Sequence, residues 1–241
     1  SRLFGGHATL NLAAYYEDFK GYQVNQAITV QDSAGNILSS SLITTNAKGA
    51  KAYGFEAELT ANLSRLDRVS FAGTYQHTRF DSLVTIDNRI YSTAPENFEN
   101  LKGNELPHAP HFSMTGTYEH DFEMANTARI TPRFTLHYET RSWLSYFNGD
   151  DASRYAAGDQ ADKGTLGTDF DKQKAYAKID LSLTYASPGD RYEIEGFGLN
   201  VTDKRIRTSA SVAGTTNGLS AVFLSNYEPP RTWGVRVRAK F

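Results

Sequence analysis

The fold class of this chain can be read from one segment, Tyr53-Gly54-Phe55-Glu56-Ala57-Glu58-Leu59-Thr60-Ala61-Asn62-Leu63. Its odd-numbered residues are tyrosine, phenylalanine, alanine and leucine, whereas its even-numbered residues are glycine, glutamate, threonine and asparagine. Successive side chains of a β-strand point to opposite faces, so this alternation predicts a strand with one apolar and one polar face.

The same alternation recurs along the chain, and no segment shows a helical period. Regular alternation predicts further strands over residues 69–76, 111–119, 128–139, 175–185 and 232–241. Two strands are less regular: one begins at residue 10 and continues through Tyr22 to about residue 30, and the other covers residues 192–201. In the latter the phase slips near Gly196, which predicts a β-bulge. We expect roughly eight strands of about ten residues, which is typical of an all-β, antiparallel, up-and-down transmembrane β-barrel.

The connections between these strands alternate in length. The short ones cover residues 64–67, 121–126 and 186–190, and the long ones cover residues 31–50, 80–110, 144–172 and 203–230. Membrane barrels have short periplasmic turns and long extracellular loops, whereas a soluble sandwich has no reason to sort loop length by side. The alternation therefore predicts a Gram-negative outer-membrane protein whose C-terminus lies on the periplasmic side.

Composition excludes several function classes. Lys+Arg 25 against Asp+Glu 27 gives a formal net charge of -2, which argues against a nucleic-acid partner. Cys 0 removes disulfides, cysteine zinc sites and thiol catalysis. We find no nucleophile elbow, P-loop or His-Glu-x-x-His motif, so we expect neither an enzyme nor a bound cofactor. A rival hypothesis, an outer-membrane enzyme with its site among the loops, would need a clustered nucleophile and base.

A soluble β-sandwich with one buried face would also produce alternation. Two further features favour a membrane. The polar face carries charges within strands, such as Arg129, Arg133 and Glu139, which suit a water-filled or plug-filled lumen. Aromatic residues gather near strand ends, as they do at membrane interfaces, so we expect outer-membrane lipid and lipopolysaccharide around the apolar face. Pro132 on that face removes a ladder donor and predicts a local bulge.

Five segments resemble TonB-dependent receptors, in the order in which that family has them. They are residues 3–16 (LFGGHATLNLAAYY), 53–59 (YGFEAEL), 103–111 (GNELPHAPH), 199–204 (LNVTDK) and 229–241 (PPRTWGVRVRAKF). Each motif is short, but together they cover nearly the whole chain. The terminal Phe241 also resembles the C-terminal aromatic residue that the outer-membrane assembly machinery reads.

This resemblance implies that residues 1–241 are the C-terminal part of a barrel of about 22 strands with a plugged lumen. The plug domain, the earlier strands and the N-terminal box that couples to the inner-membrane TonB complex are then absent from this sequence. The resemblance also implies uptake of a scarce, bulky nutrient, such as a ferric siderophore, cobalamin or an oligosaccharide. The alternative is a self-contained small outer-membrane barrel, acting as a passive pore or as a structural protein.

Charged residues on the polar face are candidate contacts for an anionic ligand or for the plug. One stripe, basic except for one glutamate, comprises Arg129, Arg133, His137, Glu139 and Arg141. A second basic stripe comprises Arg236, Arg238 and Lys240. For both stripes, we expect structural pairing inside the barrel more than contact with a ligand.

Two segments contain residue types that bind metals. His108 and His111 lie close together, and residues 149–171 hold six aspartates, whose oxygens could bind Ca²⁺. The histidines fit the polar loop exit of the resembled family, and the aspartate spacing matches no EF-hand loop. We therefore expect no metal site at either place.

Overall fold

The computed structural model describes residues 2–3, 7–34, 37–47, 49–86, 98–149, 171–213 and 222–240. Regular structure in these residues is antiparallel β-sheet, apart from a short 3₁₀ turn at Pro188–Asp190. Within these ranges, no helix is long and apolar enough to cross a membrane.

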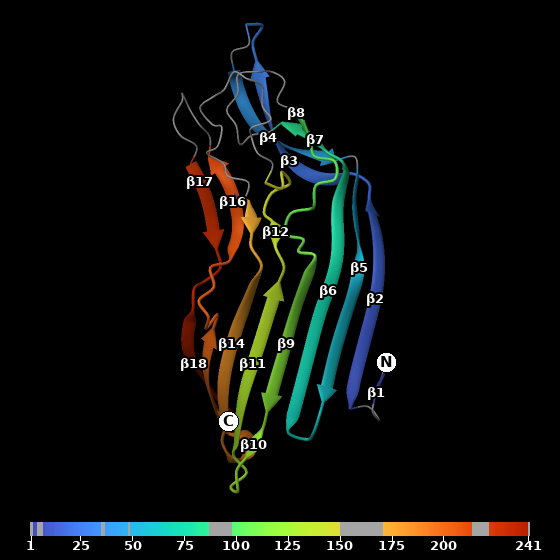
Figure 1. Cartoon of the computed structure of the whole chain (residues 1–241). Coiled ribbons are helices and arrows are strands. Elements are labelled where there is room, and N and C mark those ends of the chain that lie inside the picture. Colours follow the sequence, from blue (N-terminus) through green and yellow to red (C-terminus); the bar gives the residue numbers. More distant parts are fainter. Residues whose placement is uncertain are drawn as a thin grey trace.

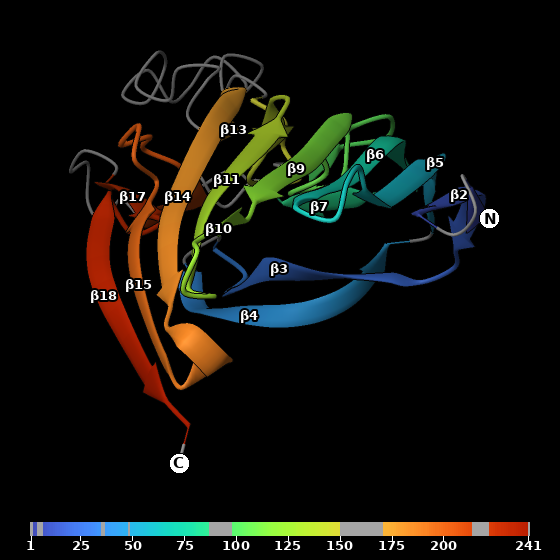
Figure 2. The same cartoon turned by 90° about the horizontal axis from the view of Figure 1, so that it is seen from below.

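The main sheet follows the order of the chain. A short strand, β10 (Phe122–Glu123), pairs with β11 beside the main path. The path itself runs through β1 (Arg2–Leu3), β2 (Ala8–Phe19), β5 (Gly49–Asn62), β6 (Asp67–Ser82), β9 (Phe112–His120), β11 (Arg129–Glu139), β14 (Tyr176–Ala186), β15 (Tyr192–Leu199) and β18 (Thr232–Ala239). The sheet curves into an open arc with β1–β2 and β18 at its two edges (Figure 2). The eight longer strands of this path lie at the eight predicted places.

The first predicted strand is wrong in its length. β2 ends at Phe19, and Gly21 follows with a φ of 81°, a left-handed conformation that favours glycine. The next strand, β3 (Tyr22–Gln31), leaves the main sheet and pairs with β4 (Ile37–Ala47) in a separate hairpin. Residues 31–50, which we predicted as a loop, therefore contain a strand.

Three smaller sheets lie in the other long connections. They are β7–β8 (Val84–Ile86 and Phe98–Asn100), β12–β13 (Ser142–Trp143 and Lys172–Gln173) and β16–β17 (Arg207–Ala213 and Val222–Tyr227). These sheets and the β3–β4 hairpin gather at one end of the arc, which we call the loop end (Figure 1). The short connections lie at the opposite end, the turn end, as the alternation in loop length predicts.

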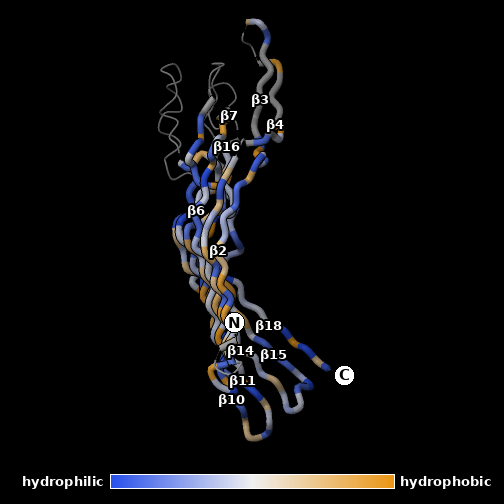
Figure 3. The backbone as a smooth tube through the Cα atoms, turned by 90° about the vertical axis from the view of Figure 1, so that its right-hand side faces the viewer, coloured by the Kyte–Doolittle hydropathy of each residue, from blue (hydrophilic) through white to orange (hydrophobic). Residues whose placement is uncertain are grey.

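The register joins the apolar residues of neighbouring strands on one face, the apolar face. Phe134 of β11, for example, lies opposite Tyr118 of β9 and Leu181 of β14. Large side chains on this face are exposed, including Leu12 at 72% and Phe55 at 65%. Hydropathy alternates along the strands, so the other face is polar (Figure 3). An exposed apolar surface that extends over several strands calls for a covering medium.

Neither predicted bulge is present. β15 keeps one register with β14 and β18 on both sides of Gly196, so the phase slip arises because Phe197 lies on the polar face. The register of β11 with β14 also runs through Pro132 without a shift. On the other side of β11, the ladder is interrupted between its pairings with β9 and β10, so the proline lies beside a gap in the hydrogen bonds.

The buried apolar core lies at the loop end. It consists of Val24, Ala50, Phe80, Leu83, Leu101, Leu106, Ala109 and Phe147, with Tyr22 and Tyr146 packed against it. The core includes residues of β3, of the wall and of the long connections. The Tyr146 hydroxyl also donates a hydrogen bond to the backbone carbonyl of Asn25 at 2.9 Å. The long connections are thereby fixed to the wall.

Candidate functional site

The polar face carries an ion-pair network at the turn end, formed by neighbouring strands. Arg68 of β6 donates to Glu119 of β9 at 3.0 Å (Nε–Oε2) and to Asp121 at 2.7 Å (Nη1–Oδ2). Arg133 of β11 lies 3.2 Å from Glu119, and Arg129 lies 3.8 Å from Asp121. Two arginines of the first predicted stripe therefore pair with carboxylates of the wall itself.

Asp121 is the enclosed anion of this network. It lies between β9 and β10 and is only 8% exposed. The Thr131 hydroxyl donates to its Oδ1 at 2.6 Å, in addition to the bonds from Arg68. The hydrogen bonds from Arg68 hold the pKa of Asp121 below its usual range; burial opposes this lowering, and Thr131 adds to it. The carboxylate is therefore charged at neutral pH.

The middle of the first stripe is held by hydrogen bonds around His137. Its Nδ1 lies 2.8 Å from the Thr115 hydroxyl oxygen, and its Nε2 lies 3.0 Å from Glu139 Oε1. The Tyr176 hydroxyl lies 3.4 Å from the same Nε2. Because both ring nitrogens have partners, the imidazole is fixed against the wall.

At the loop end, Arg141 holds the segment 103–111 against β11. Its two Nη atoms donate to Glu105 at 3.0 and 2.8 Å, which makes a bidentate pair. His111 Nε2 lies 3.2 Å from the same carboxylate. The Asn148 side chain donates to the backbone carbonyl of Glu105 at 3.0 Å. Glu105 thus joins two connections of the loop end, the one before β9 and the one after β11.

The two arginines of the second predicted stripe are also paired. Arg236 lies 2.5 Å from Glu195, and Arg238 lies 3.1 Å from Glu193, so both ion pairs cross from β18 to β15. The Arg236 guanidinium also lies 5.5 Å from the ring centre of Phe197. These arginines are therefore already engaged by the wall.

Two carboxylates that we did not single out from the sequence lie on the polar face of β5. Glu56 and Glu58 are both exposed, and no cation of the described residues pairs with either. Glu58 accepts a long hydrogen bond of 3.5 Å from the Asn11 side chain. The signal was present in the sequence, since both residues occupy polar positions of the segment 53–63.

The glycine of that segment has a packing role. A Cβ on Gly54 would lie 2.2 Å from the backbone carbonyl oxygen of Tyr75, far inside ordinary contact. The Tyr15 hydroxyl would lie 3.0 Å from the same Cβ, and it donates to Gln76 at 3.3 Å. The β5–β6 pair therefore leaves no room for a side chain at this position.

The segment 199–204 forms a closed turn after β15. The Asn200 side chain donates to the Lys204 carbonyl and accepts from the Lys204 amide, both at 2.9 Å. Asn200 has a φ of 49°, a left-handed conformation that asparagine tolerates. Asp203 accepts from the backbone amide of Arg231 at 3.1 Å, which joins this turn to the start of β18.

The histidines and aspartates of the two candidate metal-binding segments form no metal site within the described residues. Among the residues that the structure describes, no group of three His, Asp or Glu side chains could hold a metal ion. His108 donates its backbone amide to Trp143 at 2.8 Å, and His111 faces Glu105. The acidic segment at residues 150–170 and the terminal Phe241 lie outside the described residues.

The family follows from a direct match. A family model described as "TonB dependent receptor-like, beta-barrel" matches residues 1–203. The chain belongs to the TonB-dependent receptor barrel family. Its polar face is accordingly the inner wall of an outer-membrane barrel, and its apolar face is the side that meets lipid. No curated protein matches the chain in sequence.

Solved structures share this fold at low identity. The ferric yersiniabactin uptake receptor FyuA from Yersinia pestis matches with a TM-score of 0.64 and 19% identity, over 98% of this chain and 28% of that chain. The siderophore receptor PiuA from Acinetobacter baumannii gives 0.61 and 15%, over 98% and 26%. The copper transporter OprC gives 0.59 and 16%, over 97% and 30%. This TonB-dependent receptor sequence thus spans less than a third of the length of these solved receptors.

Proposed function

We propose that this chain is the C-terminal part of the barrel wall of a receptor that takes up a scarce, bulky nutrient across the outer membrane. The observation that carries the proposal is the open arc, in which β18 and the β1–β2 pair remain edges. A self-contained barrel of about eight strands would pair its first strand with its last. The match of the whole chain to only 28% of FyuA also favours a sector of a larger barrel.

We further propose a ferric siderophore as the nutrient. FyuA and PiuA, which share the fold, are described as a ferric yersiniabactin receptor and a siderophore receptor. The turn end and the C-terminus would face the periplasm, and the connections of the loop end would capture the ligand outside the cell. Cobalamin and oligosaccharides are the competing nutrients, and a passive pore is the competing function.

The plug domain is the proposed partner of the inner wall. Arginines of the wall, such as Arg68, Arg133 and Arg236, pair with carboxylates of the wall itself. Glu56 and Glu58 pair with no cation of the described residues, so their two negative charges are available to a basic surface of the plug. We expect the double change to glutamine to raise passive ion conductance of the full-length receptor in a planar bilayer, because the plug would be held less tightly. Glu17→Gln, which removes one carboxylate charge from the same face on β2 nearer the loop end, is the control. Equal conductance of all three proteins would contradict this pairing.

Uptake of radioactive iron tests the function. The full-length gene is expressed in a Gram-negative host that lacks its own siderophore receptors, and ⁵⁵Fe bound to a panel of siderophores is supplied. We expect accumulation of at least one complex, and its loss when the host lacks the TonB complex. Accumulation that does not depend on TonB would favour a passive pore. Uptake of cobalamin or an oligosaccharide in place of iron would refute the siderophore and leave the transporter.

A further inference from the structure

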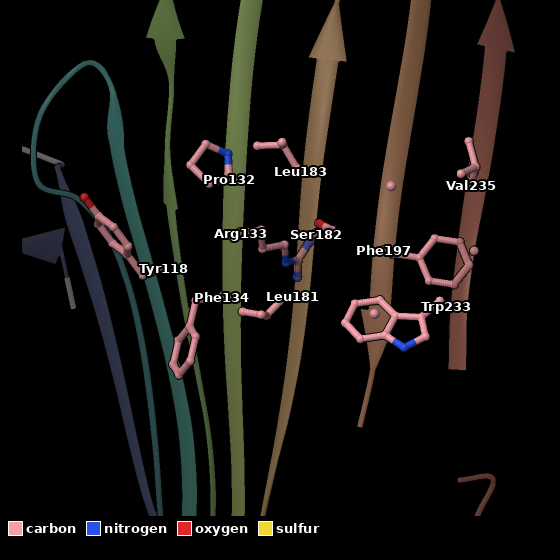
Figure 4. Close-up of a pocket in the computed structure, with 13 residues that line it drawn as sticks. Tyr118, Pro132, Arg133, Phe134, Leu181, Ser182, Leu183, Phe197, Trp233 and Val235 are labelled. Carbon is pink, nitrogen blue, oxygen red and sulfur yellow. The ribbon is translucent and has the colours of Figure 1, made fainter. Parts of the chain in front are cut away.

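A groove of about 680 Å³ runs along β15 on the apolar face, between two ridges of side chains (Figure 4). Leu181 and Leu183 of β14 form one ridge, and Trp233 and Val235 of β18 form the other. Neighbouring strands lie about 4.8 Å apart, so ridges two strands apart are separated by about 10 Å. Once the radii of the side chains are subtracted, this width suits a single alkyl chain.

The floor of the groove consists of two glycines with different surroundings. A Cβ on Gly196 would meet no atom within 4 Å, so the floor is open there. A Cβ on Gly198 would lie 2.1 Å from the Trp233 ring, so the indole already covers that position. Trp233 therefore closes the groove on the side of the loop end. On the side of the turn end the groove is bounded by Ile194, the next residue of β15 on this face.

A cation lies at the turn end of β15, on the far side of Ile194 from the groove. Arg191 is exposed, directly precedes β15 and has its guanidinium 5.8 Å from the ring of Tyr192, which belongs to the apolar face. No carboxylate of the described part of the chain pairs with Arg191. A tyrosine and an arginine at the edge of a membrane-facing surface are the residue types that meet lipid headgroups.

We propose that this surface binds one phospholipid of the inner leaflet, with its phosphate at Arg191 and one acyl chain that passes over Ile194 and enters the groove as far as Trp233. The lipid is the fitting occupant because the groove is continuous with the face that meets the membrane. The inner leaflet follows from the position of Arg191, which lies at the turn end directly before β15 begins at Tyr192. The inference rests on the family and on the proposed orientation of the wall, and it does not depend on the nutrient.

The preference for this site is modest in size. Bulk lipid is as apolar as the groove, so the hydrophobic effect cancels and only packing and the phosphate contact remain. We therefore expect each single change described next to weaken binding about fivefold, which corresponds to about 1 kcal/mol.

Fluorescence quenching of Trp233 measures the binding. Full-length receptor in dodecyl maltoside micelles is titrated with phosphatidylglycerol that carries bromine in the middle of its acyl chains. The difference between the receptor and its Trp233→Phe variant isolates the signal of this indole. We expect saturable quenching, with the half-quenching concentration raised about fivefold by Gly196→Leu, which fills the groove, and by Arg191→Gln.

Two matched variants keep the test selective. Gly116→Leu adds the same side chain at another open glycine of the apolar face, and Arg65→Gln removes an exposed arginine from another short turn. Both controls should leave the titration unchanged. Equal effects of Gly196→Leu and Gly116→Leu, or no saturable quenching at all, would overturn the proposal. Displacement by lipopolysaccharide at lower concentration than by phospholipid would also overturn it. So would a disulfide-crosslinked dimer of the Gly196→Cys receptor.

Discussion

Replacement of Asp121 by asparagine removes the enclosed anion of the turn-end network. Asp121 receives two bonds from Arg68, at 2.7 and 3.2 Å, and one from Thr131 at 2.6 Å. Breaking a buried ion pair costs about 3–5 kcal/mol of unfolding free energy. Arg68 keeps Glu119, its side chain is 40% exposed, and asparagine can still accept one bond. We therefore expect Asp121→Asn to lower the unfolding free energy by about 2 kcal/mol.

The measurement is guanidinium unfolding of the full-length receptor in detergent, followed by tryptophan fluorescence. Asp190→Asn is the matched control, because Asp190 is 53% exposed and has its contact with Arg129 at 3.5 Å. Surface pairs of this kind contribute about 0–1 kcal/mol. We expect the midpoint of Asp190→Asn to stay close to that of the unchanged receptor.

The stability contributed by Asp121 depends on pH in a direction set by its lowered pKa. The pKa of Asp121 is lowered in the folded protein, so its contribution is complete above the pKa of the unfolded chain, about 3.9. It is lost as the pH falls through the lower folded pKa. The difference between the receptor and Asp121→Asn should therefore be full at pH 7 and shrink below about pH 4. If Asp121→Asn behaves like Asp190→Asn at pH 7, the network does not stabilise the wall as reasoned here.

Three further predictions follow from packing and orientation. Gly54→Ala should destabilise the barrel by about 3 kcal/mol, because the new Cβ meets backbone, and an unchanged melting temperature would contradict this. Gly198→Ala should cost only about 1 kcal/mol, because an exposed indole can move aside, and its tryptophan emission should shift; an unshifted emission would count against it. The sequence has no cysteine, so the single substitutions Ser33→Cys and Met124→Cys report which end of the wall faces the cell exterior. In intact cells an impermeant maleimide should label position 33 and leave 124 unlabelled, and the reverse result would invert the proposed orientation.

Much of the wall was predictable because one face of each strand must be apolar and the other polar. Period-two alternation located all eight long strands, but the predicted strand 69–76 stops six residues short of the end of β6 at Ser82, and the first strand was drawn too long. That strand was drawn too long because β3 is itself a strand, and only the left-handed Gly21 separates it from β2. The β16–β17 hairpin was missed because β17 does not alternate: it begins with the apolar run Val222-Phe223-Leu224 and continues with Ser225-Asn226.

The bulge at Gly196 was wrong for an informative reason. The sequence shows a phase slip, but the register shows that aromatic residues cover glycines on both faces of the β15–β18 pair. Trp233 lies over Gly198 on the apolar face, and Phe197 lies over Gly234 on the polar face. An aromatic residue on the polar face therefore imitates a bulge in the hydropathy pattern.

The inner wall was predictable in composition but not in pairing. The sequence places Arg129 and Arg133 on the polar face, but it does not show that Glu119 and Asp121 arrive beside them from β9 and its turn. Which charges remain unpaired depends on the register between strands that are far apart in the chain. That Glu56 and Glu58 lack a cationic partner among the described residues can therefore be seen only in the folded sheet.

The order of strands in the main sheet bears on how such receptors diverge. The long strands of the main sheet pair in the order in which they occur along the chain. Each long connection therefore links its own pair of neighbouring strands. Doubling the length of a flexible loop costs only about 0.6 kcal/mol. Long connections can therefore change in length while the wall keeps its register, except where residues such as Glu105 and Tyr146 join one connection to another. A wall of this kind tolerates change in its long connections, in keeping with a shared fold at 15–19% identity.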